Sequence, residues 1–384
     1  MQTLVDENDY EAEMQKRVLP ALASCARDGW VDPFDSALPA RFGRLHYVWY
    51  DYAKFASTQV SLGVGEGADT GVLANADAAA RAGKGVDASS VANAENNTAG
   101  DPGNSAVTWQ GTVVISHGFT EFAEKYAEII FQWLSHGYNV CMLEHRGHGH
   151  SARDIADPHL VWIDSWHRYV EDLAHVITTV VRPNAGNKPV CLYSHSMGGG
   201  IAASMLELYP DIVDVTVLSS PMIQPQTAGL PAWLARALGE TACWAGWGTK
   251  KVIGQQRFSE APDWSRYDGA SMPRMRRYHR LRVENVDYQT NCATFQWVCE
   301  AMRMSSFVLN PAHCAALRTP TLLIQAGRDS WVSNDAQNLF IERANAGRLA
   351  VVHRIQFSQS LHEVFSMPND MQEEYWQSIF EFVK

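Results

Sequence analysis

The stretch Pro189-Val-Cys-Leu-Tyr-Ser-His-Ser-Met-Gly-Gly-Gly-Ile201 joins two predicted elements with no loop between them. The apolar run after Pro189 predicts a buried strand of a parallel sheet, and the small, apolar residues from Met197 to Leu208 predict a buried helix. A residue at so sharp a corner is held out at the carboxyl end of the sheet. We expect Ser196 at that corner.

The residues around Ser196 match most of the nucleophile-elbow pattern Gly-x-Ser-x-Gly, whose glycines let strand and helix approach closely. Here the pattern is Ser194-His-Ser-Met-Gly198, so a serine replaces the first glycine. Gly199 and Gly200 follow and favour the close approach. The alternative is a glycine-rich helix start that packs on a sheet or binds an anion at its N-terminus.

The composition indicates a globular, acidic protein. The chain has 384 residues, of which 46% are hydrophobic, enough for one large α/β domain with an inserted subdomain. The formal net charge of −11 argues against a nucleic-acid partner and against a general binder of anionic membranes, because both attract basic surfaces.

The cysteines and the N-terminal residues predict the compartment. Seven cysteines without a Cys-x-x-Cys pair indicate core thiols in a reducing compartment rather than a disulfide framework or a zinc site. The acidic start lacks the features of a secretory signal, and no apolar run reaches transmembrane length. We expect a cytoplasmic protein, with a peripheral position on the inner membrane as the alternative.

Regions of different composition follow one another along the chain. Residues 1–60 hold an amphipathic segment around Met14 to Ala26 and a first strand from Arg44, and residues 61–106, which lack aromatics, predict a disordered insertion. Alternating strands and helices in 107–221 and 311–384 predict a doubly wound, mostly parallel sheet. Residues 222–310 interrupt this alternation and would lie above Ser196 as a helical cap.

A serine hydroxyl is a weak nucleophile near neutral pH, so it needs a base to take its proton and an acid to orient that base. In proteins with such an elbow, both follow the serine in the chain, each after the end of a strand. Asp329 follows a predicted strand that ends at Gly327. His362 follows another that ends near Phe357. We predict Ser196 as nucleophile, Asp329 as acid and His362 as base.

Acyl transfer through a tetrahedral intermediate also needs two donors for the oxyanion, and loss of one typically lowers the rate by ~10²–10³. The amide of Met197 directly follows the elbow serine. The amide of Phe119 follows His117-Gly118, at the end of another predicted strand. We predict these two amides as the oxyanion hole.

The loop His145-Arg-Gly-His-Gly-His-Ser151 contains three histidines, a composition that also occurs at metal sites. His145, His148 and His150 lack a supporting acid cluster and a helical pair of ligands. We therefore interpret them as loop packing and predict neither a metal nor an organic cofactor.

With these residues placed, the chain resembles the monoglyceride-lipase-like branch of the α/β-hydrolases (hydrolase-4, serine aminopeptidase S33), and more closely the bacterial lysophospholipases of the L-two type. The resemblance covers residues 107–384 and is carried by His117-Gly-Phe-Thr-Glu121 with Lys125-Tyr126, His145-Arg-Gly-His-Gly-His-Ser151, Ala156-Asp-Pro-His-Leu160, Tyr169-Val-Glu-Asp-Leu-Ala174, His195-Ser-Met-Gly-Gly199 and Leu361-His-Glu363.

This resemblance implies an α/β-hydrolase fold with an inserted helical cap, and it implies the same roles for the catalytic trio and the two oxyanion amides. One departure is Glu144, because members of the family usually carry aspartate there. The longer side chain puts the hydrogen bonds of a loop-bracing carboxylate in question, but not the chemistry.

The resemblance also implies a serine carboxylic-ester hydrolase of single-chain lipids that works through an acyl-Ser196 intermediate. A lysophospholipid is the first expected substrate, and a monoacylglycerol lipase or general carboxylesterase is the alternative. A peptidase or a catalytically silent binding module of the same fold is a further alternative. The expected partners are the lipid and, peripherally, a membrane, and the sequence predicts no particular oligomeric state.

Substrate selection is expected in the cap. The run Arg274-Met-Arg-Arg-Tyr-His-Arg-Leu-Arg282 contains five arginines, and guanidinium groups suit phosphate. We predict Arg276 and Arg277 as contacts for a phosphate head group or a membrane, and Trp233 as part of an acyl-binding surface. The alternatives are ion pairs to the acidic body or a solvated helix face for the arginines, and packing within the cap for the tryptophan.

Overall fold

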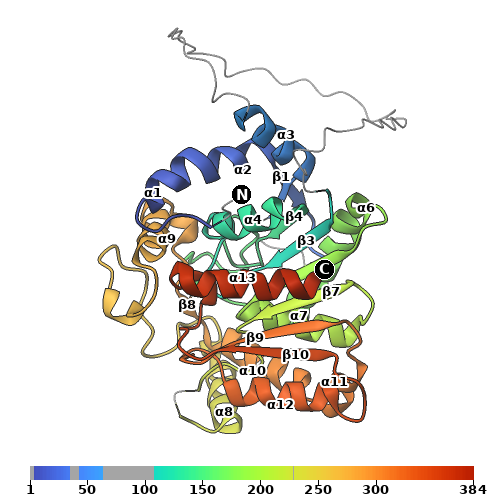
Figure 1. Ribbon diagram of the computed structural model, residues 1–384. Helices are drawn as coiled ribbons and strands as arrows, with labels where there is room; N and C mark the ends of the chain where they lie inside the picture. The colour runs from blue at the N-terminus through green and yellow to red at the C-terminus, as the bar shows by residue number, and fades with distance from the viewer. Residues whose placement is uncertain (1–3, 35–42, 64–107, 228) are drawn as a thin grey trace.

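The computed structural model describes residues 4–34, 43–63, 108–227 and 229–384 (Figure 1). Residues 64–106 of the predicted disordered insertion lie outside this range. Residues 61–63 are the end of a helix.

The centre of the molecule is one mostly parallel sheet of eight strands in the order β1-β2-β4-β3-β6-β7-β9-β10. Only the two neighbouring pairs that involve β2 are antiparallel. The strands are β1 Ala26–Val31, β2 Leu45–Tyr50, β3 Gly111–Ser116, β4 Tyr138–Leu143, β6 Val190–His195, β7 Val215–Ser219, β9 Thr321–Ala326 and β10 Val352–Phe357. The predicted doubly wound sheet is thus confirmed.

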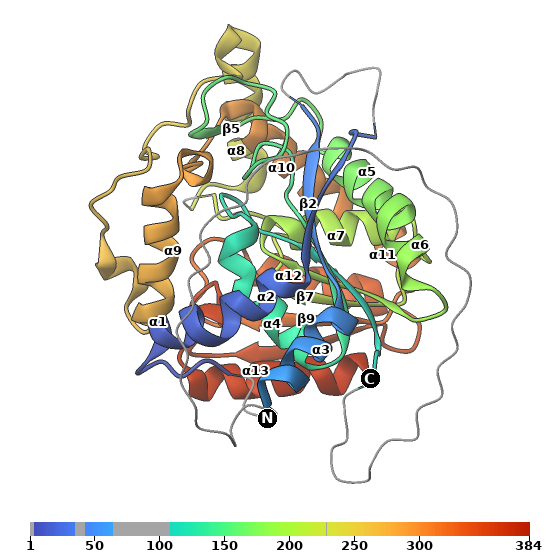
Figure 2. The same ribbon diagram turned by 90° about the horizontal axis from the view of Figure 1, so that it is seen from above.

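Helices cover both faces of the sheet, which explains why the central strands β3 and β6 are mainly apolar and fully buried. One face carries α1 Tyr10–Glu13, η1 Met14–Val18, α2 Leu19–Cys25, α3 Tyr52–Gly63, α4 Ala127–Ser135 and α13 Asn369–Val383 (Figure 1). The other carries α5 His167–Val176, η3 Ile177–Val181, α6 Arg182–Ala185, α7 Met197–Leu208, α11 Pro311–Ala316 and α12 Asn334–Asn345 (Figure 2). Each layer buries its own apolar core against the sheet.

The N-terminal region contains more regular structure than the sequence predicts. The expected helix around Met14 to Ala26 begins earlier, at Tyr10, and strand β1 was missed. β1 is an edge strand whose side chains are mostly exposed, so it lacks the apolar alternation by which strands are recognised. The strand expected from Arg44 ends at Tyr50, because the Asp51 side chain accepts the amide of Lys54 and begins α3.

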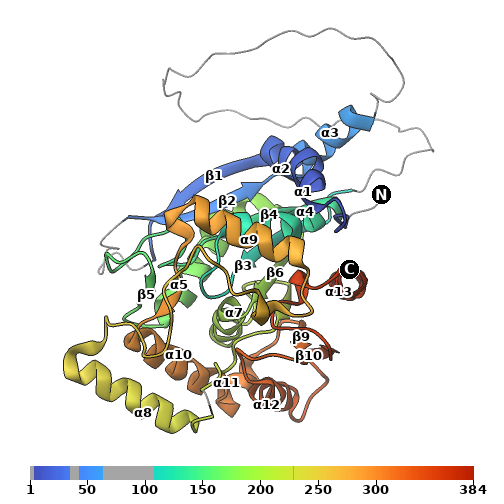
Figure 3. The same cartoon turned by 90° about the vertical axis from the view of Figure 1, so that its left-hand side faces the viewer.

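The segment between β7 and β9 is mainly helical and contains α8 Ala232–Ala242, η4 Cys243–Trp247, η5 Trp264–Tyr267, α9 Met272–Glu284, η6 Val286–Tyr288, β8 Cys292–Ala293 and α10 Phe295–Val308. β8 pairs with β5, Leu160–Val161, which lies in the connection after β4. α10 packs on α7, and α8 lies at the outer edge of the molecule (Figure 3). Among the described residues, no helix combines the length and the apolar character needed to cross a bilayer.

Candidate active site

Ser196 lies between β6 and α7 in a backbone conformation that non-glycine residues rarely adopt, with φ of 51° and ψ of −118°. Its amide donates to the carbonyl of Ser219 at 3.1 Å, and its own carbonyl accepts the amides of Gly199 and Met222 at 2.9 and 2.7 Å. Such strain persists only where neighbouring structure holds it. These bonds hold the corner that exposes the hydroxyl.

The glycine pattern of the elbow follows from the space around it. A Cβ on Gly198 would lie 2.2 Å from the carbonyl oxygen of Ser116 on β3, so this position requires glycine. Ser194 occupies the place of the first glycine in the pattern. Its side chain is buried and donates to the carbonyl of Val217 at 3.2 Å, so the site has room for a hydroxymethyl group.

The structure brings Ser196, Asp329 and His362 into one hydrogen-bonded chain. His362 Nδ1 lies 2.6 Å from Asp329 Oδ2, and His362 Nε2 lies 2.8 Å from Ser196 Oγ. Because a carboxylate can only accept, Nδ1 carries the proton and Nε2 is free to accept the serine hydroxyl. The Asp329 side chain is fully buried and that of His362 is 12% exposed, which keeps this relay largely away from water.

Backbone bonds between two loops position Asp329 and His362. Asp329 follows β9, and its other oxygen, Oδ1, accepts the amides of Trp331 and Val332 at 2.8 and 3.0 Å. The amide of Arg328 donates to the carbonyl of Ser360 at 2.9 Å, which ties the loop after β9 to the loop after β10. The carboxylate and the imidazole therefore meet at the carboxyl edge of the sheet.

The two predicted oxyanion amides belong to backbone segments on either side of Ser196. Neither the amide of Phe119 nor that of Met197 donates to an acceptor in the described part of the chain. A Cβ on Gly118 would lie 3.0 Å from Ser196 Cβ, so the loop after β3 passes directly beside the serine. These amides are thus available to a ligand bound at Ser196.

Glu121 holds this loop in place. The sequence motif contains this residue but does not reveal its role. Its Oε2 accepts the amide of Gly118 and the hydroxyl of Tyr126, both at 2.5 Å, and Lys125 Nζ lies 2.6 Å from Oε1. Burial alone would raise the pKa of Glu121, but the charge of Lys125 and the hydrogen bonds from Lys125 and Tyr126 hold it below its usual range. Lys125 also contacts Glu363, next to the predicted base, at 2.7 Å. The spacing of Glu121 and Lys125, four residues apart, was the available signal.

We expect Glu121→Gln to lower kcat/KM for an ester about 10–100-fold, because the loop that carries the Phe119 amide loses its charged acceptor. The decrease should appear in kcat more than in KM. Glu381→Gln, at an exposed position of α13, is the matched control and should retain full activity. A native kcat in Glu121→Gln would show that the loop keeps its position without the carboxylate.

Four histidines around the site are buried and have lowered pKa values because burial disfavours the imidazolium form; they are His117, His145, His148 and His195. The pKa of His195 is lowered to about 4. In the unfolded chain the pKa of each of these histidines is about 6.5. Below that pH the unfolded chain binds protons that the folded chain does not, so the free energy of unfolding falls as the pH decreases.

We therefore expect the melting temperature to fall as the pH is lowered from about 6.5 to 5, because four histidines act in this direction, whereas Glu207, whose pKa burial raises to about 9, acts in the opposite one. Glu144 raises the pKa of His150 and, against the effect of burial, that of His46, so these two titrate above this window. His195→Gln should flatten the pH dependence, whereas the exposed His353→Gln should not. Equal slopes in both variants would contradict this origin of the acid sensitivity.

Aromatic residues of the 222–310 segment cover the loop after β3. The rings of Phe119 and Trp297 lie 4.3 Å apart, and Phe122 stacks on Tyr288 at 3.9 Å. The Tyr278 hydroxyl donates to the carbonyl of Thr120 at 3.2 Å. Ser196 is only 8% exposed beneath this cover.

The five arginines of α9 serve different contacts. Arg274 donates to Glu128 at 2.6 Å, Arg280 to Glu11 at 2.8 Å, and Arg282 to the backbone of residues 288 and 290. Ion pairing to the body, the alternative given above, thus describes Arg274 and Arg280.

The three predicted substrate contacts lie in different environments. Arg277 is buried and lines a small cavity, whereas Arg276 is exposed. Trp233 is 71% exposed on α8. The structure does not bring these three side chains together with Ser196, and their assignment to substrate stays a prediction.

Residues 108–367 match the family model described as serine aminopeptidase, S33 (Hydrolase_4). The chain belongs to this family. The expected membership is therefore confirmed. The matched region contains the elbow, both loops of the relay and the loop after β3.

Two relatives illustrate the similarity in sequence. Lysophospholipase L2 of Escherichia coli is 32% identical over 235 residues, which are 61% of this chain and 68% of the relative. Monoacylglycerol lipase of Mycolicibacterium smegmatis is 30% identical over 141 residues, which are 35% of this chain and 46% of the relative.

Solved structures share the fold at much lower identity. A carboxyl esterase of Bacillus coagulans aligns with a TM-score of 0.62 at 13% identity, covering 94% of this chain and 98% of the esterase. A soluble variant of monoglyceride lipase from Saccharomyces cerevisiae aligns with a TM-score of 0.56 at 14% identity, covering 74% and 88%. The α/β-hydrolase fold is confirmed.

Proposed function

We propose that the chain is a lipolytic serine ester hydrolase in which Ser196 is the nucleophile, His362 the base and Asp329 the acid. The observation that carries this proposal is the relay from Asp329 through His362 to a serine held at a strained elbow. A silent binding module would not need this geometry.

In the proposed reaction, Ser196 Oγ attacks the ester carbonyl as its proton passes to His362 Nε2. The oxyanion then accepts the amides of Phe119 and Met197, and Asp329 stabilises the imidazolium. The intermediate expels the alcohol, which takes the proton from Nε2. Water, deprotonated by the same nitrogen, then attacks the acyl-serine. The second tetrahedral intermediate releases the fatty acid by expelling Ser196 Oγ, which takes the proton back from Nε2.

The proposed substrate is a single-chain lipid, with a lysophospholipid before a monoacylglycerol. The support is the Escherichia coli relative, lysophospholipase L2, which aligns over more of this chain than the mycobacterial monoacylglycerol lipase does. A cationic side chain near the entrance would favour a phosphate head group, and Arg276 is the exposed candidate on α9.

The test is hydrolysis of a lysophosphatidylethanolamine and of a monoacylglycerol with the same acyl chain, by the native chain, Ser196→Ala and Arg276→Gln. Faster, Ser196-dependent release from the lysophospholipid, with a larger loss in Arg276→Gln than for the glyceride, supports the proposal. A preference for the glyceride would be consistent with the mechanism but would contradict the proposed preference for a phosphate head group. Turnover of an aminoacyl anilide alone would indicate a peptidase.

We also propose that residues 222–310 form a cap between the core segments 107–221 and 311–384, and that its outer edge contacts membrane. α8 and η4 expose Trp233, Leu238, Trp244 and Trp247, with 91% of Trp244 accessible. Tryptophan favours the interface between lipid and water. All seven cysteines are free thiols, which fits the inner, cytoplasmic side of a membrane.

We expect the Trp233→Ser, Trp244→Ser double variant to bind zwitterionic phosphatidylcholine vesicles about tenfold more weakly in sedimentation, because each exposed indole contributes apolar burial. Leu349→Ser is the matched control, since Leu349 is 92% exposed at the turn before β10. Equal binding by both variants and the native chain would exclude this edge as the contact.

A further inference from the structure

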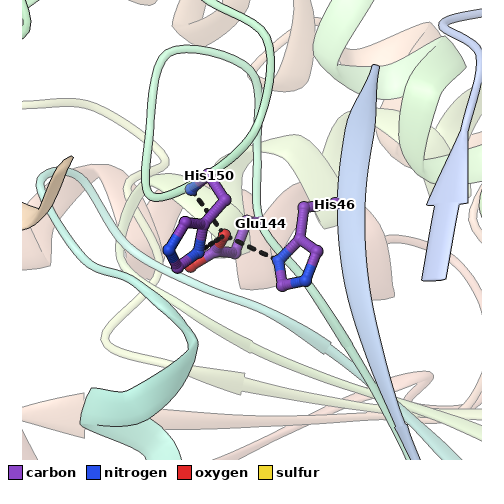
Figure 4. Close-up of side chains that lie close together, drawn as sticks. All are labelled: His46, Glu144 and His150. Atoms are coloured by element: carbon purple, nitrogen blue, oxygen red, sulfur yellow. Dashed lines mark hydrogen bonds and ion pairs between the residues drawn. The ribbon is translucent and has the colours of Figure 1, made fainter. Parts of the chain in front are cut away.

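His46, Glu144 and His150 converge from three parts of the fold (Figure 4). His46 lies on β2, Glu144 directly follows β4, and His150 is in the loop after it. One ring nitrogen of each histidine and a carboxylate oxygen of Glu144 all lie within 4.8 Å of one another. We propose that these three side chains bind a divalent transition metal ion of the zinc type.

The donor set suits such an ion, because imidazole nitrogen and carboxylate oxygen are ordinary ligands of Zn²⁺. Bonds of about 2.1 Å in a tetrahedral site place ligand atoms about 3.4 Å apart. His150 Nδ1 is 3.3 Å from Glu144 Oε2, and His46 Nδ1 is 2.9 Å from the same oxygen. The contact between His46 Nδ1 and Glu144 Oε2 must widen by about 0.5 Å, and the ring nitrogens of the two histidines, which lie within 4.8 Å of each other, must approach the same spacing.

His150 Nδ1 faces the Glu144 carboxylate. It is buried, and its close contact is the ion pair with Glu144 Oε2 at 3.3 Å (Figure 4). The Glu144 oxygen is already engaged by the amide of His150 at 2.7 Å and by His46. A metal ion would displace the proton from His150 Nδ1 and take its place beside Glu144.

The surroundings also fit a metal ligand set. His46 Nε2 lies 3.1 Å from Asp28 Oδ1, so its outer nitrogen can donate to a carboxylate while Nδ1 binds the ion, an arrangement common at zinc sites. A cavity of about 460 Å³, lined by Trp30, His150, Arg153 and Asp287 among others, opens beside His150. It gives an ion and a water ligand a route from solvent.

A second group of histidine and glutamate side chains is not a candidate metal site. Glu121, His195 and Glu363 also cluster, but Lys125 Nζ lies 2.6 and 2.7 Å from the two carboxylates. The ammonium already supplies the positive charge there. No comparable cation contacts the Glu144 carboxylate, apart from the two histidines, among the described residues.

The ion would act on the architecture of the site rather than on the reacting atoms. Glu144 Oε1 accepts the amide of Ala123 at 2.9 Å, so the carboxylate joins β2 and the histidine loop to the segment that follows Glu121. The sequence does not reveal this group because His46 lies 98 residues before Glu144.

The test is a Zn²⁺ titration by calorimetry of the full chain after chelator treatment, combined with melting temperatures. We expect one equivalent to bind and to raise the melting temperature, with Ca²⁺ having no such effect. His46→Gln and His150→Gln should each weaken binding at least tenfold, and exposed His353→Gln should not.

Cys243→Ser controls for thiol binding, because Cys243 and Cys299 have sulfur atoms 3.6 Å apart. Loss of Zn²⁺ binding in this variant, or equal binding by His46→Gln, His150→Gln and the native chain, would overturn the proposal. Titration of the native chain does not depend on the folding of any variant, and the absence of stoichiometric binding there would also overturn it.

Discussion

Ser196→Ala is expected to lower kcat/KM for ester hydrolysis roughly 10⁴–10⁶-fold, because it removes the only atom that forms the acyl-enzyme bond in the proposed reaction. The fold should be unaffected. The positive φ of 51° is enforced by backbone bonds to Ser219 and Met222, and alanine carries the same strain as serine.

The backbone strain at Ser196 leads to a second expected result, for a glycine variant. Ser196→Gly should be as inactive as Ser196→Ala but more resistant to unfolding, by about 1 kcal/mol, because glycine adopts this conformation without a Cβ penalty. Kinetics with a soluble ester and urea unfolding would measure both effects. Exposed Ser259→Ala is the control and should keep native activity and stability. Substantial turnover by Ser196→Ala would contradict the assignment of the nucleophile.

Asp329→Asn is expected to lower kcat about 10⁴-fold with little change in fold. Oδ1 of Asp329 accepts two backbone amides, from Trp331 and Val332, so the amide oxygen of asparagine should take that position. Its NH₂ group then faces His362 Nδ1 and can only donate. The imidazole must accept at Nδ1 and carry its proton on Nε2, where it can no longer deprotonate Ser196.

The pH dependence of the residual rate separates this tautomer effect from a collapsed site. We expect Asp329→Asn to regain rate at alkaline pH, where hydroxide can remove the serine proton. Asp335→Asn, an exposed acid in the first turn of α12, is the control and should retain native kcat. Near-native turnover by Asp329→Asn at neutral pH would contradict the orienting role of the carboxylate.

The fold could be predicted largely because buried parallel strands are continuous apolar runs and the helices between them have a regular period. β3 and β6 are such runs, and they fixed the centre of the sheet. The positions of Asp329 and His362 followed from strand ends alone, because the carboxyl ends of parallel strands meet at one edge. Strand β1 could not be found this way, since its stability comes from pairing with β2 rather than from burial.

The parts of the site that sequence reasoning missed depend on contacts between distant residues. Lys125 contacts both Glu121 and Glu363. Glu363 lies 238 positions after Lys125, so only the folded chain brings the two together. The arginine run shows that residues adjacent in sequence can lie in different environments. A helix turns successive residues to different surroundings, so Arg277 is buried while its neighbour Arg276 is exposed, although the sequence presents them as a pair.

The most direct test of the central claim is peptide mapping by mass spectrometry after reaction with a long-chain alkyl fluorophosphonate. This account predicts one adduct, on Ser196, that is prevented by excess lysophospholipid and greatly slowed in His362→Gln. It predicts no adduct in Ser196→Ala. An unmodified native chain, or an adduct on another residue that lysophospholipid prevents, would contradict the claim that Ser196 is the nucleophile of a lipid hydrolase.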